Sequence, residues 1–282
     1  MNVKNWKLGM SSCCTGNLDR ETFEGYANGR IDCMEISLPD YAYADIDFKQ
    51  TRKLADEYGV ELWSFHLPFS PFEENNIASP DKEIRRKTVE MQSEYIKKFS
   101  DIGIKIGVIH PSAEPNEQER RGEYIEYAKE SLATLAEVAG RGGAIIAVED
   151  LPRTCLGNCS SDIKELISAD ERLKVCFDTN HLLIQKNSDF IKEVGKDIVT
   201  AHVSDYDFIN ERHWLPYEGK NDWVEIVTLL EEAGYEGPFM YEINFAAPPS
   251  IDRRILTFED FKENYIACVN KLPAKKIGTP LI

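Results

Sequence analysis

The sequence predicts a single (β/α)₈ barrel of the α/β class, and three observations carry this prediction. Eight short apolar runs alternate with longer polar stretches that have helical periodicity. The runs are almost continuously apolar, as expected of parallel strands that are buried on both faces. The length of 282 residues suits one barrel of this class, which takes about 250 residues, so we assign residues 1–282 to one domain.

The apolar runs supply the predicted strands. In chain order they are Leu8–Met10, Ile31–Ile36, Val60–Phe65, Ile104–Ile109, Ala144–Val148, Leu173–Phe177, Ile198–Val203 and Pro238–Ile243. Open doubly wound sheets usually have fewer strands, and no GxGxxG or P-loop sequence follows any run. Eight runs therefore favour a closed barrel.

The stretches between the runs carry helix signals. Between the fourth and fifth runs, apolar residues recur at the spacing that places them on one helix face: Ile125, Ala128, Leu132, Leu135 and Val138. The stretch before it shows the same periodicity and begins after Ser79-Pro80, a cap and first-turn signal. Gly140 together with Gly142-Gly143 predicts the end of the helix between the fourth and fifth runs. Residues 273–282 are expected to form a C-terminal surface extension.

Composition bounds the class of protein. With 42% hydrophobic and 29% charged residues, the chain is typical of a globular protein with a large core. No run approaches the roughly 20 apolar residues of a membrane span, and the N-terminal residues lack the apolar centre of a secretory signal. We therefore expect a cytoplasmic protein with no membrane partner.

Charge and cysteine content exclude further classes. The net charge of −16 argues against nucleic acid as a partner, because such binding depends on clustered lysine and arginine. The seven cysteines are odd in number and scattered, so we expect free thiols rather than a disulfide framework. No G-x-S-x-G elbow supports a serine-based triad.

Polar residues that can bind metal stand at or near the ends of the later apolar runs. Glu149 ends AIIAVE, Asp178 ends VCFD, His202 lies in TAHVSD, and Glu242 lies near the end of PFMYE. Each residue alone could equally be a helix cap or a satisfied hydrogen-bonding partner. Together they are expected at the C-terminal ends of the strands, where the active sites of these barrels form. Burying such a group without a counter-charge is costly, so the pattern indicates a divalent cation.

Three carboxylates and one imidazole suit Mn²⁺, Mg²⁺, Co²⁺ or Zn²⁺. The residue types do not choose among these ions, and Mn²⁺ is the ion that we expect first. We expect one ion per chain. A second ion near His181 and His213 is left open.

The order of these motifs resembles the xylose isomerase-like TIM barrel superfamily, which includes sugar and sugar-phosphate isomerases and epimerases, related dehydratases and endonuclease IV. The resemblance runs from the first strand to Glu242 and is most specific in VCFDTNH and AHVSDYD…ERHWLPYEGKNDW. It implies the metal ligands Glu149, Asp178, His202 and Glu242, with Glu149 and Glu242 as the catalytic acid/base pair. It also implies substrate-binding positions at His66, His110, His181, Asp205, His213 and Glu35, the last as a direct or an indirect contact.

The activity implied by this resemblance is isomerisation or epimerisation of a ketose, a ketose phosphate or a related polyol ketone. It would proceed by proton abstraction next to a carbonyl through a metal-stabilised enediolate. A metal-dependent sugar or keto-inositol dehydratase uses the same first step and stays open. An endonuclease IV-like zinc phosphodiesterase that acts on abasic DNA is a third hypothesis. A non-catalytic descendant of the family is a fourth. For the nuclease, Glu211-Arg212-His213 would stand in place of Asp-Arg-His.

The substrate itself is not fixed by the sequence beyond a small sugar or sugar derivative. Three cations are candidate phosphate partners, although a surface or loop position is favoured for each: Arg153, Lys105 and Arg212. Four aromatic residues could form a wall against a sugar face or could equally pack in the barrel, with packing favoured for the first: Trp63, Phe65, Tyr206 and Trp214. Relatives of this kind often pair, so a homo-oligomer is also expected.

Overall fold

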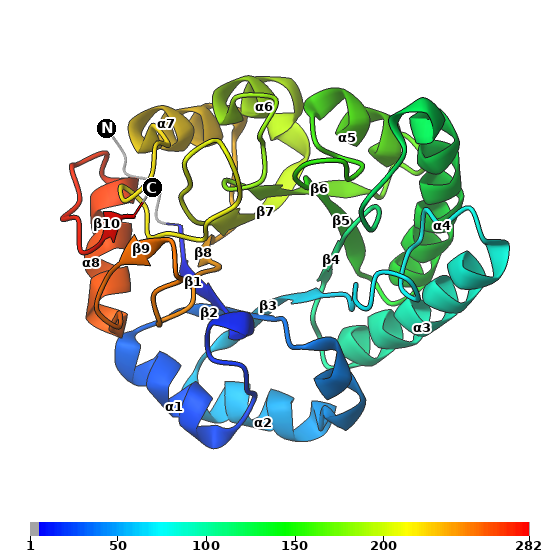
Figure 1. The fold of residues 1–282 in the computed structure, drawn as a ribbon. Helices are drawn as coiled ribbons and strands as arrows, with labels where there is room; N and C mark the ends of the chain where they lie inside the picture. Colours follow the sequence, from blue (N-terminus) through cyan, green and yellow to red (C-terminus); the bar gives the residue numbers. More distant parts are fainter. Residues whose placement is uncertain (1–5, 282) are drawn as a thin grey trace.

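Eight parallel strands close into a barrel in the computed structural model, which describes residues 6–281 (Figure 1). Each strand pairs with the next along the chain, and β8 pairs with β1 to complete the ring. The expected fold class is confirmed. The strands are β1 Leu8–Ser11, β2 Cys33–Ile36, β3 Glu61–His66, β4 Ile106–Ile109, β5 Ile145–Glu149, β6 Lys174–Asp178, β7 Ile198–Val203 and β8 Phe239–Tyr241.

In chain order a helix comes after each of the eight barrel strands, and the helices form a ring outside the barrel (Figure 1). The main hydrophobic core fills the layer between the two rings. The helices are α1 Arg20–Gly29, α2 Phe48–Tyr58, α3 Lys82–Asp101, α4 Arg121–Arg141, α5 Ser160–Ile167, α6 Asn187–Val194, α7 Trp223–Ala233 and α8 Phe258–Val269. Short 3₁₀ turns add η1 Ser12–Cys14, η2 Asp40–Asp45, η3 Gln118–Arg120 and η4 Gly195–Asp197.

Helix ends follow local hydrogen-bonding chemistry. The start of α3 differs from the expected one, because Asp81 rather than Ser79 is the N-cap and its side chain accepts from the backbone N–H groups of Glu83 and Ile84. Gly142 caps the C-terminus of α4, and Gly143 after it takes a φ of +67°. The helix therefore ends at Gly142-Gly143, as expected, whereas Gly140 lies inside it.

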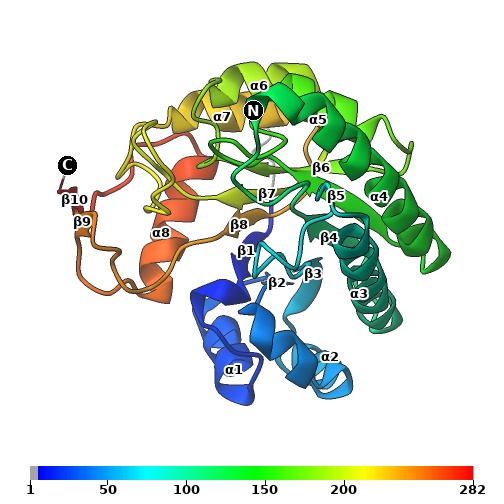
Figure 2. The ribbon, with the colours of Figure 1, turned by 45° about the vertical axis from the view of Figure 1, so that its right-hand side comes forward.

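The chain after α8 returns to the body of the protein. Thr279–Pro280 forms β10, which pairs antiparallel with β9, Ile251–Asp252, beside α8 (Figure 2). The N–H of Gly278 donates to Glu218, and the Arg253 guanidinium forms a fully buried ion pair with the same carboxylate at 2.8 Å. The segment expected as a surface extension is thus largely exposed but anchored through these contacts.

The first five residues lie outside the described part of the chain, and the expectation of no secretory signal depends partly on them. Among the helices of residues 6–281, none combines the length and the apolar character that a membrane crossing requires. The seven cysteines are free thiols.

Candidate metal centre

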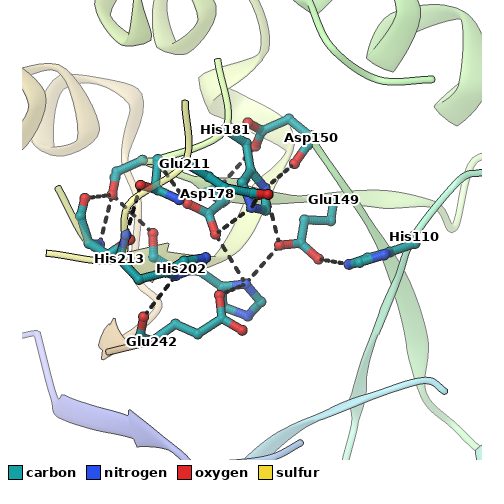
Figure 3. A network of polar contacts seen from close by, with 12 residues as sticks. His110, Glu149, Asp150, Asp178, His181, His202, Glu211, His213 and Glu242 are labelled. Atoms are coloured by element: carbon teal, nitrogen blue, oxygen red, sulfur yellow. Dashed lines mark hydrogen bonds and ion pairs between the residues drawn. The ribbon is translucent and has the colours of Figure 1, made fainter. Parts of the chain in front are cut away.

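Four side chains from consecutive late strands converge at one end of the barrel (Figure 3). Glu149 ends β5, Asp178 ends β6, His202 lies in β7, and Glu242 follows β8 directly. One ligand atom from each lies within 4.8 Å of the others. The Nδ1 atom of His202 is 2.9 Å from Glu149 Oε1, 3.4 Å from Glu242 Oε2 and 3.8 Å from Asp178 Oδ2.

Strand register explains why these residues meet. Asp178 is the register partner of His202, and Glu149 is the register partner of Cys176 on the adjoining strand. Side chains two residues apart in a strand lie on the same face, so Ala147 shares the inward face of β5 with Glu149. Ala147 packs with Val108 and Cys176 in a small separate apolar cluster below the carboxylates. Apolar side chains of β4, β5 and β6 therefore lie directly below the carboxylates.

His202 is oriented by Glu35, which is fully buried in β2. The Nε2 atom of His202 lies 3.0 Å from Glu35 Oε1, and Ser64 Oγ donates to Glu35 Oε2 at 2.8 Å. Burial opposes charge on both groups, but the His202 imidazole lowers the pKa of Glu35. Burial also works against the His202 cation, yet Cys176 and the carboxylates of Glu35, Glu242 and Glu149 raise the pKa of His202 well above its usual range. The Nδ1 atom of His202 is left facing the other three residues.

The residues present fit a divalent cation. Asp178 Oδ2 is a buried oxygen without a hydrogen-bond partner among the described residues, and it faces His202 Nδ1. Burial raises the pKa of both Asp178 and Glu242, which indicates that their negative charges lack enough compensation. A cation among three carboxylates and one imidazole would supply it, and this donor set suits Mn²⁺, Mg²⁺, Co²⁺ or Zn²⁺.

Two further histidines approach Glu149 from the other side. His66 Nε2 lies 3.0 Å and His110 Nε2 lies 3.2 Å from Glu149 Oε2. The Nδ1 atom of His66 lies 2.9 Å from the carbonyl of Leu67, to which it can donate. Burial resists ionisation of Glu149, but His202, His110 and His66 together lower its pKa well below the usual range. His66, His110 and Glu149 form a second group with the spacing of metal ligands.

A third such group contains His181, Glu211 and His213. His181 Nδ1 lies 2.8 Å from the carbonyl of Asp150, so Nε2 faces Glu211 Oε2 at 3.5 Å. Burial disfavours the His181 cation, but the carboxylates of Asp178, Glu149, Asp150 and Glu211 outweigh this effect and raise the pKa of His181 to about 9. His213 takes a φ of +50° and its Nδ1 lies 3.1 Å from the carbonyl of Glu242.

These groups open into a cavity of about 310 Å³. One part of its wall is polar and includes His66, His110, Glu149, His181, His213 and Glu242. Another part is apolar and includes Phe69, Phe72, Leu151 and Pro152. The ring of Phe69 stacks on that of His110 with centroids 4.1 Å apart. A larger cavity of about 460 Å³ lies between residues of α6 and α7, and none of the four convergent side chains lines it.

Two of the expected substrate contacts lie elsewhere. Glu35 is beneath the centre and touches His202 instead of lining the cavity. Asp205 is buried away from the cavity, and its carboxylate accepts from the backbone of Tyr217 at 2.9 Å and from the indole of Trp223 at 2.9 Å. In this structure Asp205 lies outside the cavity lining and its hydrogen bonds shape the loop after β7.

Of the two alternatives for the candidate aromatic residues, a cavity wall or packing, the structure favours packing. Phe65 stacks on Phe99 in the core, Tyr206 donates from its hydroxyl to the carbonyl of Leu182, and Trp214 donates to Ser250. All three are buried, and neither they nor Trp63 lines the cavity. The observed wall residues Phe69 and Phe72 lie in the loop after β3, a segment without periodicity from which their direction could be inferred.

Two positioning residues were missed by sequence reasoning. Asp150 follows Glu149, and its Oδ1 accepts from the backbone N–H of Asp178 at 2.7 Å. The Oδ1 atom of Asn180 accepts from the backbone N–H of Arg212 at 2.8 Å and of His213 at 3.2 Å. Asn180 therefore ties the loop after β6 to the loop after β7. Its place inside the DTNH motif was the available signal.

Comparisons with known proteins agree with the barrel fold. A family model described as xylose isomerase-like TIM barrel matches residues 27–256. An uncharacterized protein of Methanocaldococcus jannaschii is 26% identical over 90% of this chain and 87% of its own length. The D-psicose 3-epimerase of Ruminiclostridium cellulolyticum is 26% identical over 75% of this chain and 73% of its length. The crystal structure of a D-tagatose 3-epimerase-like protein superposes with a TM-score of 0.79 at 25% identity, over 94% of this chain and 98% of that one.

Proposed function

The chain belongs to the xylose isomerase-like TIM barrel family, and from this premise we propose that it is a metal-dependent epimerase or isomerase of a ketose or a related polyol ketone. One observation carries the proposal: Glu149 and Glu242 meet Asp178 and His202 at the floor of a cavity large enough for a small sugar. Two of the similar proteins, the D-psicose 3-epimerase and the D-tagatose 3-epimerase-like protein, support the substrate class.

In the proposed enzyme, Glu149, Asp178, His202 and Glu242 hold one divalent cation. When bound, it supplies Lewis-acid polarisation of the substrate carbonyl and compensates the negative charge that develops as a neighbouring carbon loses its proton. Mn²⁺ is the ion that we expect first. His202 contributes Nδ1, because its Nε2 is already engaged by Glu35.

Glu149 and Glu242 serve as the acid/base pair. They project from β5 and β8, which are not neighbours in the barrel, so they reach the cavity from different directions. One carboxylate removes the proton from the carbon next to the carbonyl. For epimerisation the other carboxyl group returns a proton to the opposite face of that carbon, and for isomerisation the proton goes to the adjacent carbon.

The remaining polar wall positions the substrate. His110, His181 and His213 line the cavity and present ring nitrogens that can bind hydroxyl groups, whereas His66 lines it with both nitrogens engaged by Leu67 and Glu149. Phe69 and its apolar neighbours offer a surface for the C–H face of a sugar. Together these groups hold the reacting carbon near the carboxylates, which is the main contribution that positioning makes to such reactions.

The experiment that tests the proposal is a screen of ketoses, ketose phosphates and keto-inositols with Mn²⁺-loaded protein in D₂O, followed by NMR. Deuterium in recovered substrate or product at a carbon next to the carbonyl is the expected result. Glu242→Gln should abolish this exchange, whereas Glu117→Gln, an equal charge change at an exposed position outside the cavity, should not. Full exchange by Glu242→Gln would contradict the assigned role.

A dehydratase is the closest alternative because it begins with the same proton abstraction. In that reaction a hydroxyl group β to the carbonyl leaves after the proton is removed. Product analysis in the same screen distinguishes the two activities. A dehydrated product in place of an epimer or an isomer would favour the lyase.

A zinc phosphodiesterase is the second candidate function, and a specific observation favours it. The groups His66–His110–Glu149 and His181–Glu211–His213 lie on either side of the four-residue centre, an arrangement that offers places for two more ions. The net charge of −16 opposes binding of a nucleic-acid duplex. Cleavage of a duplex with an abasic site, together with three zinc ions per chain in elemental analysis, would establish the nuclease. One ion per chain and no cleavage supports sugar chemistry.

A further inference from the structure

Arg153 is the only lysine or arginine among the described residues that line the cavity. It lies in the loop after β5 with a φ of +53°, a conformation that is uncommon for a residue with a side chain. Asn158 Nδ2 donates to the carbonyl of Arg153 at 2.7 Å and helps to hold the backbone there. The backbone conformation of this loop therefore holds Arg153 with its guanidinium at the cavity.

The guanidinium is already neutralised by two carboxylates from two other loops. Its Nε donates to Glu114 Oε2 at 2.9 Å, and its Nη1 donates to Glu211 Oε1 at 2.7 Å. Nη1 also donates to Asn210 Oδ1 at 3.0 Å. The side chains of Glu114 and Glu211 are only 22% and 30% exposed, so solvent screens these pairs less than it screens pairs on an open surface. The single lysine or arginine at the wall is thus paired with two carboxylates and has no net positive charge to offer a ligand.

A phosphorylated ligand would meet an unfavourable environment here. To bind it, Arg153 would have to leave Glu114 and Glu211, and both carboxylates would then stand unpaired beside the incoming phosphate. Like charges placed next to each other are a strong means of rejecting a ligand. By contrast, the hydroxyl groups of an uncharged sugar can bind the imidazoles of this wall without displacing any ion pair.

The other two candidate phosphate partners do not reach the cavity. Arg212 pairs with Asp207 Oδ2 at 2.7 Å and lies over the ring of Trp214. Lys105 precedes β4, at the opposite end of the barrel, and donates to the carbonyl of Gly142. Neither lines the cavity.

We propose that this site selects uncharged sugars over their phosphates, and that Glu114 is the specificity-determining residue because its ion pair occupies Arg153. This inference rests on the proposed function and adds to it the class of substrate. Glu114 does not belong to any of the possible metal-ligand groups among the described residues, so its effect on selectivity can be separated from metal binding.

The test compares kcat/KM for paired substrates in Mn²⁺-loaded enzyme. The pairs are D-fructose with D-fructose 6-phosphate and D-ribulose with D-ribulose 5-phosphate, measured by solvent deuterium exchange. Wild type should prefer the free ketose by at least roughly tenfold. Glu114→Gln should narrow this ratio on the order of tenfold, mainly through a gain on the phosphate, because Arg153 loses one of its two anionic partners. Glu117→Gln, the same charge change in the same loop but exposed and outside the cavity, should leave the ratio unchanged.

The ratio is internal to each variant, so a loss of folded protein cancels from it. A wild-type enzyme that acts on the phosphate as well as or better than on the free ketose would overturn the inference. An unchanged ratio in Glu114→Gln, or an equal change in Glu117→Gln, would overturn the role of Glu114. Absence of exchange on all four sugars in every variant would instead count against the proposed function, and this inference would fall with it.

Discussion

Replacing Glu35 by glutamine should weaken metal binding although Glu35 is not one of the four proposed ligands. The carboxylate is fully buried and lies 3.0 to 3.1 Å from His202 Nε2. In the proposed centre it accepts the Nε2 proton of His202, so that Nδ1 keeps its lone pair for the cation. An amide is neutral and can also present its N–H₂ group to the ring, which would favour the wrong tautomer.

The expected magnitude follows from the partners that are lost. Removing such an outer partner of a metal-binding histidine typically costs about 10- to 100-fold in metal affinity. That range corresponds to roughly 1.4–2.7 kcal/mol, at about 1.4 kcal/mol per tenfold change. Ser64 Oγ, which donates to Glu35 at 2.8 Å, can still donate to the glutamine carbonyl. We therefore expect the protein to fold, with a loss of about 1–3 kcal/mol in the free energy of unfolding of the metal-free form.

Isothermal titration with Mn²⁺ measures the effect directly. The matched control is Glu61→Gln, which removes a carboxylate at the N-terminal end of the neighbouring strand β3, where Glu61 pairs with Lys7 far from the centre. The control should bind Mn²⁺ as wild type does. A folded Glu35→Gln protein whose Mn²⁺ affinity stays within twofold of wild type would refute the reasoning.

Four further predictions follow from the geometry. Glu242→Gln should lower the rate of solvent exchange by about 10²–10⁴-fold while thermal unfolding stays cooperative; exchange at the wild-type rate would rule out its acid/base role. Chelation by EDTA should abolish exchange and added Mn²⁺ should restore it, whereas EDTA-resistant activity would exclude the metal-dependent mechanism. Gly219→Ala should lower the free energy of unfolding by about 1–3 kcal/mol, because the new Cβ would lie 2.2 Å from Asp205 Oδ1. Urea denaturation measures this loss, and an unchanged midpoint would contradict the packing. The ion pair with Arg254 lowers the pKa of Asp260 from 3.8 to about 2, so its contribution is present above pH 3.8 and is lost as the pH falls toward 2. Asp260→Asn should therefore lower the free energy of unfolding by about 1 kcal/mol at pH 7, after allowance for the exposed arginine. Near pH 2 the loss should be small. An equal loss at both pH values would disprove the assignment.

The strands were predictable because parallel barrel strands are buried on both faces and leave a continuous apolar signal. The residues at which the strands begin and end were less predictable. Ile31 belongs to the second apolar run, yet it lies before β2 and its N–H donates to the carbonyl of Tyr26 at the end of α1. Hydrophobicity records burial, and a buried helix end gives the same signal as a buried strand. The N-cap of α3 was expected at Ser79 and is Asp81. Both residue types can cap a helix, so the sequence alone did not distinguish them.

The candidate site was predictable where strands point its residues and unpredictable where loops do. Asp178 and His202 meet because parallel pairing fixes their register. Asp205 lies only three residues after His202, but backbone N–H groups of a later part of its own loop, at Tyr217 among others, draw its carboxylate away from the cavity. The arrangement at Arg153 depends on its left-handed backbone and on contacts with two distant loops, neither of which sequence spacing reports.

The most direct test of the central claim is the position of the metal in crystals of the wild-type protein grown with Mn²⁺, read from anomalous scattering. The account predicts one strong peak about 2.0–2.3 Å from carboxylate oxygens of Glu149, Asp178 and Glu242 and from Nδ1 of His202. A peak only at His181, Glu211 and His213, or no ordered Mn²⁺ among the four side chains in a folded protein, would contradict it.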